Sequence, residues 1–155
     1  MSPVLLLPFW FIKIIAKIWG KILVFGMKIW LGLNLKIIGD YNNKKSCIIA
    51  VKHQSAWETV VCTSIFDMPS IVLKKELIYL PIIGLYFLKG RAIPIIRENT
   101  IESLKKIVKM AKINLKKGSS ILIFPQGTRV PLNASTKDYP YQSGIYFLYS
   151  QCNCL

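Results

Sequence analysis

Acidic residues are scarce in this chain, and histidine is scarcer. The 155 residues include 7 Asp and Glu against 21 Lys and Arg, which gives a formal net charge of +14, and there is a single histidine. This charge favours an anionic partner, either a membrane surface or a nucleic acid. Nucleic acid is the weaker candidate, because the lysines are dispersed and no nucleic-acid-binding motif is present. An AT-rich genome would also enrich lysine, so part of the charge has a compositional explanation.

The chain also lacks the ligands of a structural metal site. Its four cysteines, at positions 47, 62, 152 and 154, form no C-x-x-C pair, and one histidine cannot complete the usual zinc sets. We therefore expect no metal. We expect Cys47 and Cys62 to be reduced thiols of the core, as in a reducing compartment. The length predicts one domain or part of one.

No hydrophobic run is long enough to cross a membrane, although the first third of the chain is strongly apolar. A spanning helix needs about 20 nearly uninterrupted apolar residues. The longest run here, residues 4–12, has nine and contains Pro8. A signal peptide would place its charge before the apolar run and end in a small-residue cleavage site, and neither feature is present.

The lysines of this region predict an amphipathic helix. In a helix with about 100° per residue, four of them fall within an arc of roughly 80°. They are Lys13, Lys17, Lys21 and Lys28. Such a helix lies in the headgroup region with its lysines reaching acidic lipids. We predict that residues 1–39 form a membrane-associated segment, which glycines at 20, 26 and 32 would allow to bend into two helices. A helix buried in a protein core and a tilted span with snorkelling lysines are the alternatives.

Strand and helix signals alternate after a polar break at residues 40–46. Short apolar runs predict strands at 46–51, 70–73, 92–97 and 119–125. Other patterns predict helices at 56–66, 80–88 and 101–117. Asn99 suits the N-cap of the last helix and Gly118 its C-terminal end. The alternation predicts an α/β domain over residues 40–155, a partly parallel sheet with flanking helices.

The histidine, His53, stands between a predicted strand and a predicted helix. Ser55 and Glu58 have the S-x-x-E spacing of a capping box, so Ser55 is the expected N-cap and Glu58 has an ordinary role as a backbone cap. The same geometry lets Glu58 reach one ring nitrogen of His53 while the other nitrogen takes a proton from a hydroxyl. The pattern by itself is a weak signal of catalysis.

Two further motifs strengthen that signal. They are "GRAIPIIR", residues 90–97, and "FPQGTR", residues 124–129. Together with "HQSAWE", residues 53–58, they resemble the ordered motifs of the glycerolipid acyltransferases, the acylglycerol-phosphate acyltransferase family. That family has H-x4-D first, a glycine-to-arginine segment next and F-P-E-G-T-R third. The tyrosine–glycine segment at 138–144 resembles the family too, so the resemblance runs from about residue 46 to 149.

The resemblance implies a phospholipid-biosynthesis enzyme on the cytoplasmic face of the inner (plasma) membrane. It would move a fatty acyl group from acyl-CoA or acyl carrier protein to lysophosphatidic acid (1-acyl-glycerol-3-phosphate), making phosphatidic acid without a further cofactor. By this resemblance His53 is the general base and Glu58 its partner, with Ser55 and Gln126 in support. Four residues would hold the acceptor phosphate: Arg97, Gly127, Thr128 and Arg129.

Three departures from the family pattern accompany the resemblance. Glu58 replaces the usual aspartate, and Gln126 replaces the usual glutamate, which keeps hydrogen bonding and loses the charge. After Tyr149 a polar tail stands where the family has a further apolar strand with a proline, so we expect a C-terminally incomplete domain. The alternative function is therefore an inactive truncated fragment that acts at most as a membrane-binding module.

Overall fold

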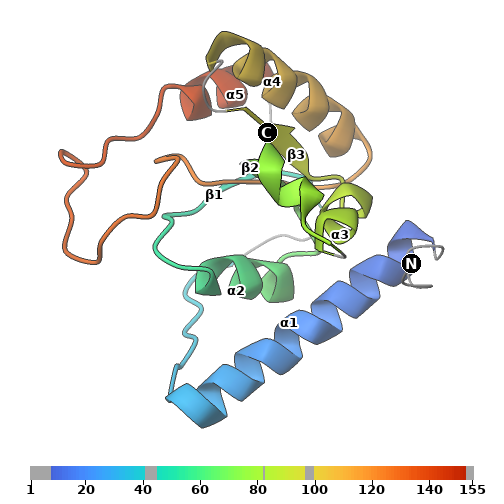
Figure 1. The fold of residues 1–155 in the computed structure, drawn as a ribbon, viewed down its shortest axis with the longest axis vertical. Coiled ribbons are helices and arrows are strands. Elements are labelled where there is room, and N and C mark those ends of the chain that lie inside the picture. Colours follow the sequence, from blue (N-terminus) through green and yellow to red (C-terminus); the bar gives the residue numbers. More distant parts are fainter. Residues whose placement is uncertain (1–7, 41–44, 82, 97–99, 153–155) are drawn as a thin grey trace.

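A four-stranded sheet forms the centre of the computed structural model, which describes residues 8–40, 45–81, 83–96 and 100–152 (Figure 1). The strands are β1 (Ile48–Ala50), β2 (Ser70–Lys74), β3 (Ile93–Ile95) and β4 (Ile121–Ile123). They are ordered β1-β4-β2-β3, and every neighbouring pair is parallel. The predicted α/β fold is confirmed, and the described sheet is parallel throughout.

Both faces of the sheet are covered, as parallel strands require. Successive side chains alternate between the faces. Ile121 and Ile123 pack on one side with Leu148, whereas Leu122 packs on the other with Cys62. Helices α4 (Thr100–Lys116) and α5 (Gly144–Cys152) cover the first face, and α2 (Trp57–Ile65) lies beyond the second (Figure 1).

The end of α4 agrees with the sequence prediction. Gly118 has a φ of 77°, and its N–H donates to the carbonyl of Leu115 at 2.9 Å. The N–H of Ser119 donates to the carbonyl of Asn114 at 2.9 Å, which completes a Schellman motif. The predicted N-cap, Asn99, lies outside the described residues.

Two helical segments differ from the prediction. A 3₁₀ helix, η2 (Lys75–Tyr79), was not predicted; it precedes α3 (Ile83–Lys89), which confirms the helix predicted within residues 80–88. Gly84 lies against the carbonyl of Ile78, where a Cβ would come within 1.9 Å, so this turn depends on glycine. Helix α5 was not predicted and continues through the expected polar tail to Cys152, because Leu148 anchors it in the core.

Helix α1 (Phe9–Leu31) is one uninterrupted helix of 23 residues, so the bend into two helices that its glycines would allow does not occur. Gly20 is buried against α2 instead of bending the chain. A Cβ on Gly20 would lie 3.1 Å from the Cβ of Ser64. Gly32, with a φ of 67°, ends the helix. Gly20 therefore serves helix packing and Gly32 helix termination, whereas Gly26 has open space beside it.

Contacts at its N-terminal half fasten α1 to the rest of the molecule. Lys13 forms an ion pair with Asp67, with Nζ 2.6 Å from Oδ2, so this lysine of the predicted stripe is paired within the chain. The Arg91 guanidinium lies 3.9 Å from the centroid of the Phe9 ring. Ile12 and Gly20 are the buried residues of α1, which therefore does not have the environment of a core helix.

Within the described ranges, no helix combines the length and the apolar character needed to cross a membrane.

Candidate active site

The site lies at one edge of the sheet because its motifs follow parallel neighbouring strands. His53 comes shortly after β1, and Phe124 directly follows β4, the strand beside β1. The carboxyl ends of parallel strands share one edge, which is where α/β sheets commonly bind ligands. Strand β3 is separated from β4 by β2. Arg97, which follows β3 in the sequence, lies outside the described residues.

His53 and Glu58 contact each other directly, as predicted. Nδ1 of His53 is 2.6 Å from Oε1 of Glu58. The same oxygen accepts the backbone N–H groups of Gln54 at 2.6 Å and Ser55 at 2.8 Å. The other oxygen, Oε2, accepts the Ser55 hydroxyl at 2.8 Å. Glu58 therefore caps the backbone and partners the histidine at the same time, so the two alternatives are compatible.

The helix after the histidine begins one residue later than predicted. The residue before the helix is Ala56, which makes no side-chain cap hydrogen bond. The two reciprocal bonds of the predicted capping box are nevertheless present: the Ser55 hydroxyl accepts the N–H of Trp57 at 3.0 Å, and Glu58 accepts the N–H of Ser55 at 2.8 Å. The Glu58 carboxylate accepts the N–H groups of both Gln54 and Ser55, and residues 54–56 form a bend before the helix.

The Glu58 carboxylate is held in its charged form. Burial would raise its pKa, but hydrogen bonds from its own backbone N–H, from Ser55 and from His53 outweigh burial and lower the pKa to about 2. An ionised carboxylate can only accept hydrogen bonds, so we assign the Nδ1 proton of neutral His53 from this contact. The lone pair is then on Nε2, the nitrogen that can take a proton from a hydroxyl.

Two contacts from the third motif hold His53 in place. Its ring stacks on Phe124, with centroids 4.3 Å apart and planes 30° apart. Its backbone carbonyl accepts the N–H of Val130 at 2.7 Å. The side chain is 20% exposed, and among the described residues Nε2 has no hydrogen-bond partner. The sequence analysis missed Phe124 as a functional residue, although an aromatic directly after a buried strand was a usable signal.

The third motif forms a tight turn beside the histidine. The N–H of Gly127 donates to the carbonyl of Phe124 at 3.0 Å, and Gly127 has a φ of 68°, a conformation that favours glycine. Thr128 and Arg129 follow as exposed residues. Since Val130 bonds to His53, the turn places Arg129 next to a residue that touches the candidate base.

Gln126 is buried in the same turn and 5% exposed. Its Nε2 lies 3.4 Å from the carbonyl of Tyr139, and Oε1 has no hydrogen-bond partner among the described residues. The N–H of Gln142 donates to the carbonyl of Pro125 at 2.9 Å. The tyrosine–glycine segment is therefore tied to the back of the turn, and Gln126 supports this loop.

Arg91 has a structural role. It opens the glycine-to-arginine segment, but it precedes β3, and its side chain extends toward Phe9. Its Nη1 also donates to the hydroxyl of Ser119 at 3.3 Å. Asn114 in turn donates to the Arg91 carbonyl at 3.0 Å. These contacts join α1, β3 and the end of α4 near the amino ends of the strands, whereas the candidate site lies at their carboxyl ends.

Among the described residues, Cys62 is the cysteine nearest in sequence to the histidine motif, and it is not an activated thiol. Burial, and secondarily the charge of Glu58, raise the pKa of Cys62 to about 11. Cys62 is thus the core thiol predicted, whereas Cys47 is only partly buried, with Sγ 3.8 Å from the hydroxyl of Ser120. Over the part of the chain that the structure describes, no three His, Cys, Asp or Glu side chains gather as metal ligands.

The fold and site define a class of protein: an α/β domain with a histidine–carboxylate pair and a glycine turn at the carboxyl edge of its sheet. The Acyltransferase family model matches residues 34–154, and the chain belongs to this family. The resemblance to the glycerolipid acyltransferases seen in the sequence is confirmed.

Relatives with curated names come from bacteria, plants and yeast. The 1-acyl-sn-glycerol-3-phosphate acyltransferase of Pseudomonas aeruginosa is 34% identical over 126 residues, which are 81% of this chain and 49% of the relative. The protein of that name from Limnanthes douglasii is 28% identical over 94% of this chain and 51% of its own length. The one from Saccharomyces cerevisiae is 31% identical over 81% of this chain and 42% of its own length. The chain spans about half the length of these relatives. No solved structure matches it significantly.

Proposed function

We propose that this chain carries the catalytic centre of a 1-acylglycerol-3-phosphate acyltransferase. The acyl group comes from a thioester, acyl-CoA or acyl carrier protein, and the product is phosphatidic acid. The 2.6 Å contact between His53 and Glu58 is the observation that carries the proposal. The names of the relatives from Pseudomonas aeruginosa and Saccharomyces cerevisiae support the choice of acceptor.

The proposed reaction needs one proton shuttle. Nε2 of His53 takes the proton of the acceptor hydroxyl while the hydroxyl oxygen attacks the thioester carbonyl carbon. The tetrahedral intermediate collapses as its C–S bond breaks, and the imidazolium returns the proton to the leaving thiolate. Glu58 stabilises the imidazolium through its contact with Nδ1. General-base assistance of this kind contributes roughly 10²–10⁴-fold in rate.

The acceptor phosphate is assigned to the glycine turn and its arginine. Guanidinium forks and loop amides suit a phosphate monoester. In this proposal Gly127, Thr128 and Arg129 bind the phosphate together with Arg97. The bond from Val130 to His53 supports the assignment, because it fixes the spacing between the arginine and the base.

Exposed apolar side chains on α1 support membrane association. Large hydrophobic residues lie on the side of α1 that faces away from α2; examples are Ile14, Ile18, Ile22 and Ile29, each at least 48% exposed. A soluble surface seldom carries such a continuous apolar strip. We propose that this strip lies in the headgroup region on the cytoplasmic side, with the remaining lysines of α1 toward acidic lipids.

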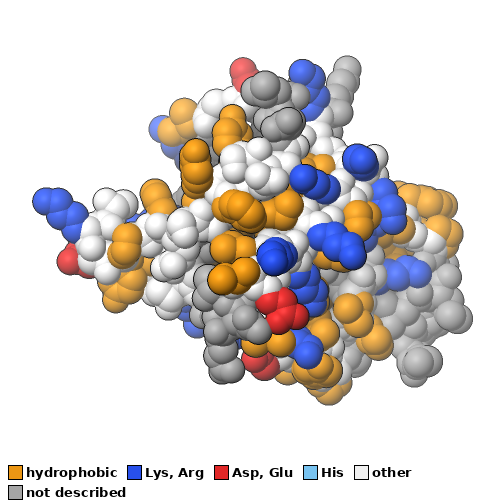
Figure 2. All heavy atoms as spheres, turned by 90° about the horizontal axis from the view of Figure 1, so that it is seen from above, with side chains coloured by type: hydrophobic (Ala, Val, Ile, Leu, Met, Phe, Trp, Pro, Cys, Tyr) orange, Lys and Arg blue, Asp and Glu red, His pale blue; other side chains and the backbone are white. Residues whose placement is uncertain are grey.

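A second set of lysines lies away from α1. Exposed lysines of α4 gather on the face seen in Figure 2, which lies across the sheet from α1 in Figure 1. They are Lys105, Lys106, Lys109, Lys112 and Lys116. The positive charge is therefore divided between two sides, and only the lysines of α1 belong to the proposed membrane face.

A direct assay tests this function. The purified chain is incubated with lysophosphatidic acid and acyl-CoA, or with acyl carrier protein as donor, and phosphatidic acid is measured by mass spectrometry. Product formation that His53→Ala abolishes supports the proposal. Vesicle binding without turnover, with either donor and with a folded protein, would leave the membrane-binding module as the function.

A further inference from the structure

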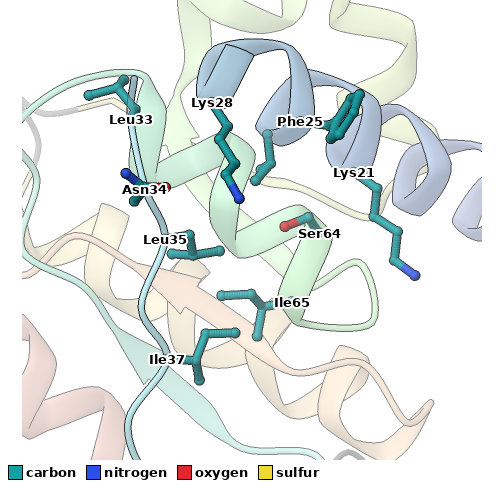
Figure 3. A pocket seen from close by; sticks show the side chains of 10 residues that line it. Lys21, Phe25, Lys28, Leu33, Asn34, Leu35, Ile37, Ser64 and Ile65 are labelled. Carbon is teal, nitrogen blue, oxygen red and sulfur yellow. The ribbon is translucent and has the colours of Figure 1, made fainter. Parts of the chain in front are cut away.

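A hollow of about 480 Å³ lies between the C-terminal half of α1, the end of α2 and the extended segment 33–37 (Figure 3). Most of its lining is apolar, with Val24, Phe25, Leu33, Leu35, Ile37 and Ile65. Two lysines, Lys21 and Lys28, also line it, and no acidic residue does. His53 precedes the other end of α2, so the hollow is separate from the candidate active site.

The two lysines supply positive charge beside the apolar walls, Lys28 inside the hollow and Lys21 at its rim (Figure 3). They are seven residues apart on α1, which puts them on the same side of the helix and about 10 Å apart along its axis. In Figure 3 the Lys28 side chain extends from α1 into the space between Asn34 and Ser64. Lys13 pairs with Asp67, whereas neither hollow lysine has an acidic partner among the described residues.

The surroundings of the hollow favour a lipid. Trp30, in the last turn of α1, is 86% exposed, and Ile38, which follows Ile37 in the extended segment, is 82% exposed. These side chains suit the interface of a bilayer, which would bring the mouth of the hollow to the headgroups. A free phosphate would gain nothing from the apolar walls, and a zwitterionic lipid would gain little from two lysines.

We propose that the hollow binds one anionic phospholipid of the bilayer, with its phosphate beside Lys28, the positive charge of Lys21 at the rim, and an acyl chain along Leu35 and Phe25. This inference rests on the membrane association proposed above. The bound lipid joins α1 to the end of α2, the helix whose first turn holds Glu58. It therefore stabilises the packing of α1 against the domain, because a ligand that binds only the folded state stabilises it.

The site can be tested without a bilayer. Monomeric dihexanoyl-phosphatidylglycerol, kept below its micelle concentration, is titrated into the purified chain by calorimetry, beside dihexanoyl-phosphatidylcholine and inorganic phosphate. We expect saturable one-to-one binding of the phosphatidylglycerol, and much weaker binding of the other two probes. Lys21→Gln and Lys28→Gln should each weaken binding about fivefold. Lys17→Gln removes the same charge from α1 outside the hollow and should leave binding nearly unchanged.

Vesicle binding separates this proposal from the one on which it rests. If the chain binds neither phosphatidylcholine nor phosphatidylglycerol vesicles, membrane association fails. If the chain binds phosphatidylglycerol vesicles but Lys17→Gln weakens binding of the monomeric lipid as much as Lys28→Gln does, the lysines act only through their overall charge. The proposed site is then refuted. The proposal would also be overturned if light scattering shows a dimer whose oligomeric state does not change when the lipid is added. A second copy of the chain would then be the occupant of the hollow.

Discussion

Replacing Glu58 by glutamine separates its two contacts, because glutamine retains an acceptor oxygen but loses the charge. The retained oxygen can still accept the N–H groups of Gln54 and Ser55, so the cap survives. The imidazolium of His53 loses its anionic partner. Hydrogen bonds to charged groups contribute about 1.5–3 kcal/mol, and losing that support in the transition state should lower kcat about 10- to 150-fold.

The assay compares kcat and thermal stability in Glu58→Gln and Ser55→Ala. Ser55→Ala removes the hydroxyl that bonds Glu58 and the N–H of Trp57, but it keeps the carboxylate beside His53. We expect it to cost about 1 kcal/mol of stability with little loss of kcat. Near-full kcat in a folded Glu58→Gln variant would refute the charge-support argument and leave Glu58 as a cap.

Acid unfolding gives an independent readout of the same carboxylate. Folding lowers the pKa of Glu58 from 4.5 to about 2. The stabilisation from a depressed carboxyl pKa is present above the unfolded value and is lost as the pH falls toward the folded value. The free energy of unfolding should therefore fall more steeply between about pH 4.5 and 2 in the wild type than in Glu58→Gln. Parallel curves for the two proteins would contradict the depressed pKa.

Four further substitutions test the other parts of the structure. His53→Ala should lower kcat by roughly 10²–10⁴-fold while the melting temperature changes little; a large loss of stability would mean that the stack on Phe124 matters more than the base. Arg129→Ala should raise the Michaelis constant for lysophosphatidate more than that for the thioester, and equal effects would assign the arginine to fold support. Gly26→Ala, which has open space around its Cβ, should stabilise α1 by up to about 1 kcal/mol. Gly20→Ala meets Ser64 at 3.1 Å and should destabilise the chain, as thermal unfolding would show.

Local sequence was enough for the elements whose signals are short-range. Apolar runs located all four strands, because a buried parallel strand needs little more than consecutive β-branched residues. Gly118 marked the end of α4 through its positive φ. Helix α5 escaped prediction because what stabilises it is the burial of Leu148 against the sheet and α4, which no local pattern records.

The N-terminal helix shows the limit of helical periodicity. Lysine spacing predicted a helix with a basic stripe, but the orientation of that helix depends on α2. Gly20 fits closely against Ser64, and Lys13 reaches Asp67, 54 positions away in the sequence. These contacts decide which residues of α1 are covered and which lysines stay unpaired around the hollow.

The candidate site divides in the same way. The contact between His53 and Glu58 follows from a spacing of five residues across a helix start, so the sequence alone determined it. Only the tertiary structure put Phe124 and Val130 against His53. That contact depends on β4 lying beside β1, although two other strands come between them along the chain. Strand order is set by how the whole sheet buries its two faces, and the energy that selects it is spread over residues distant in sequence.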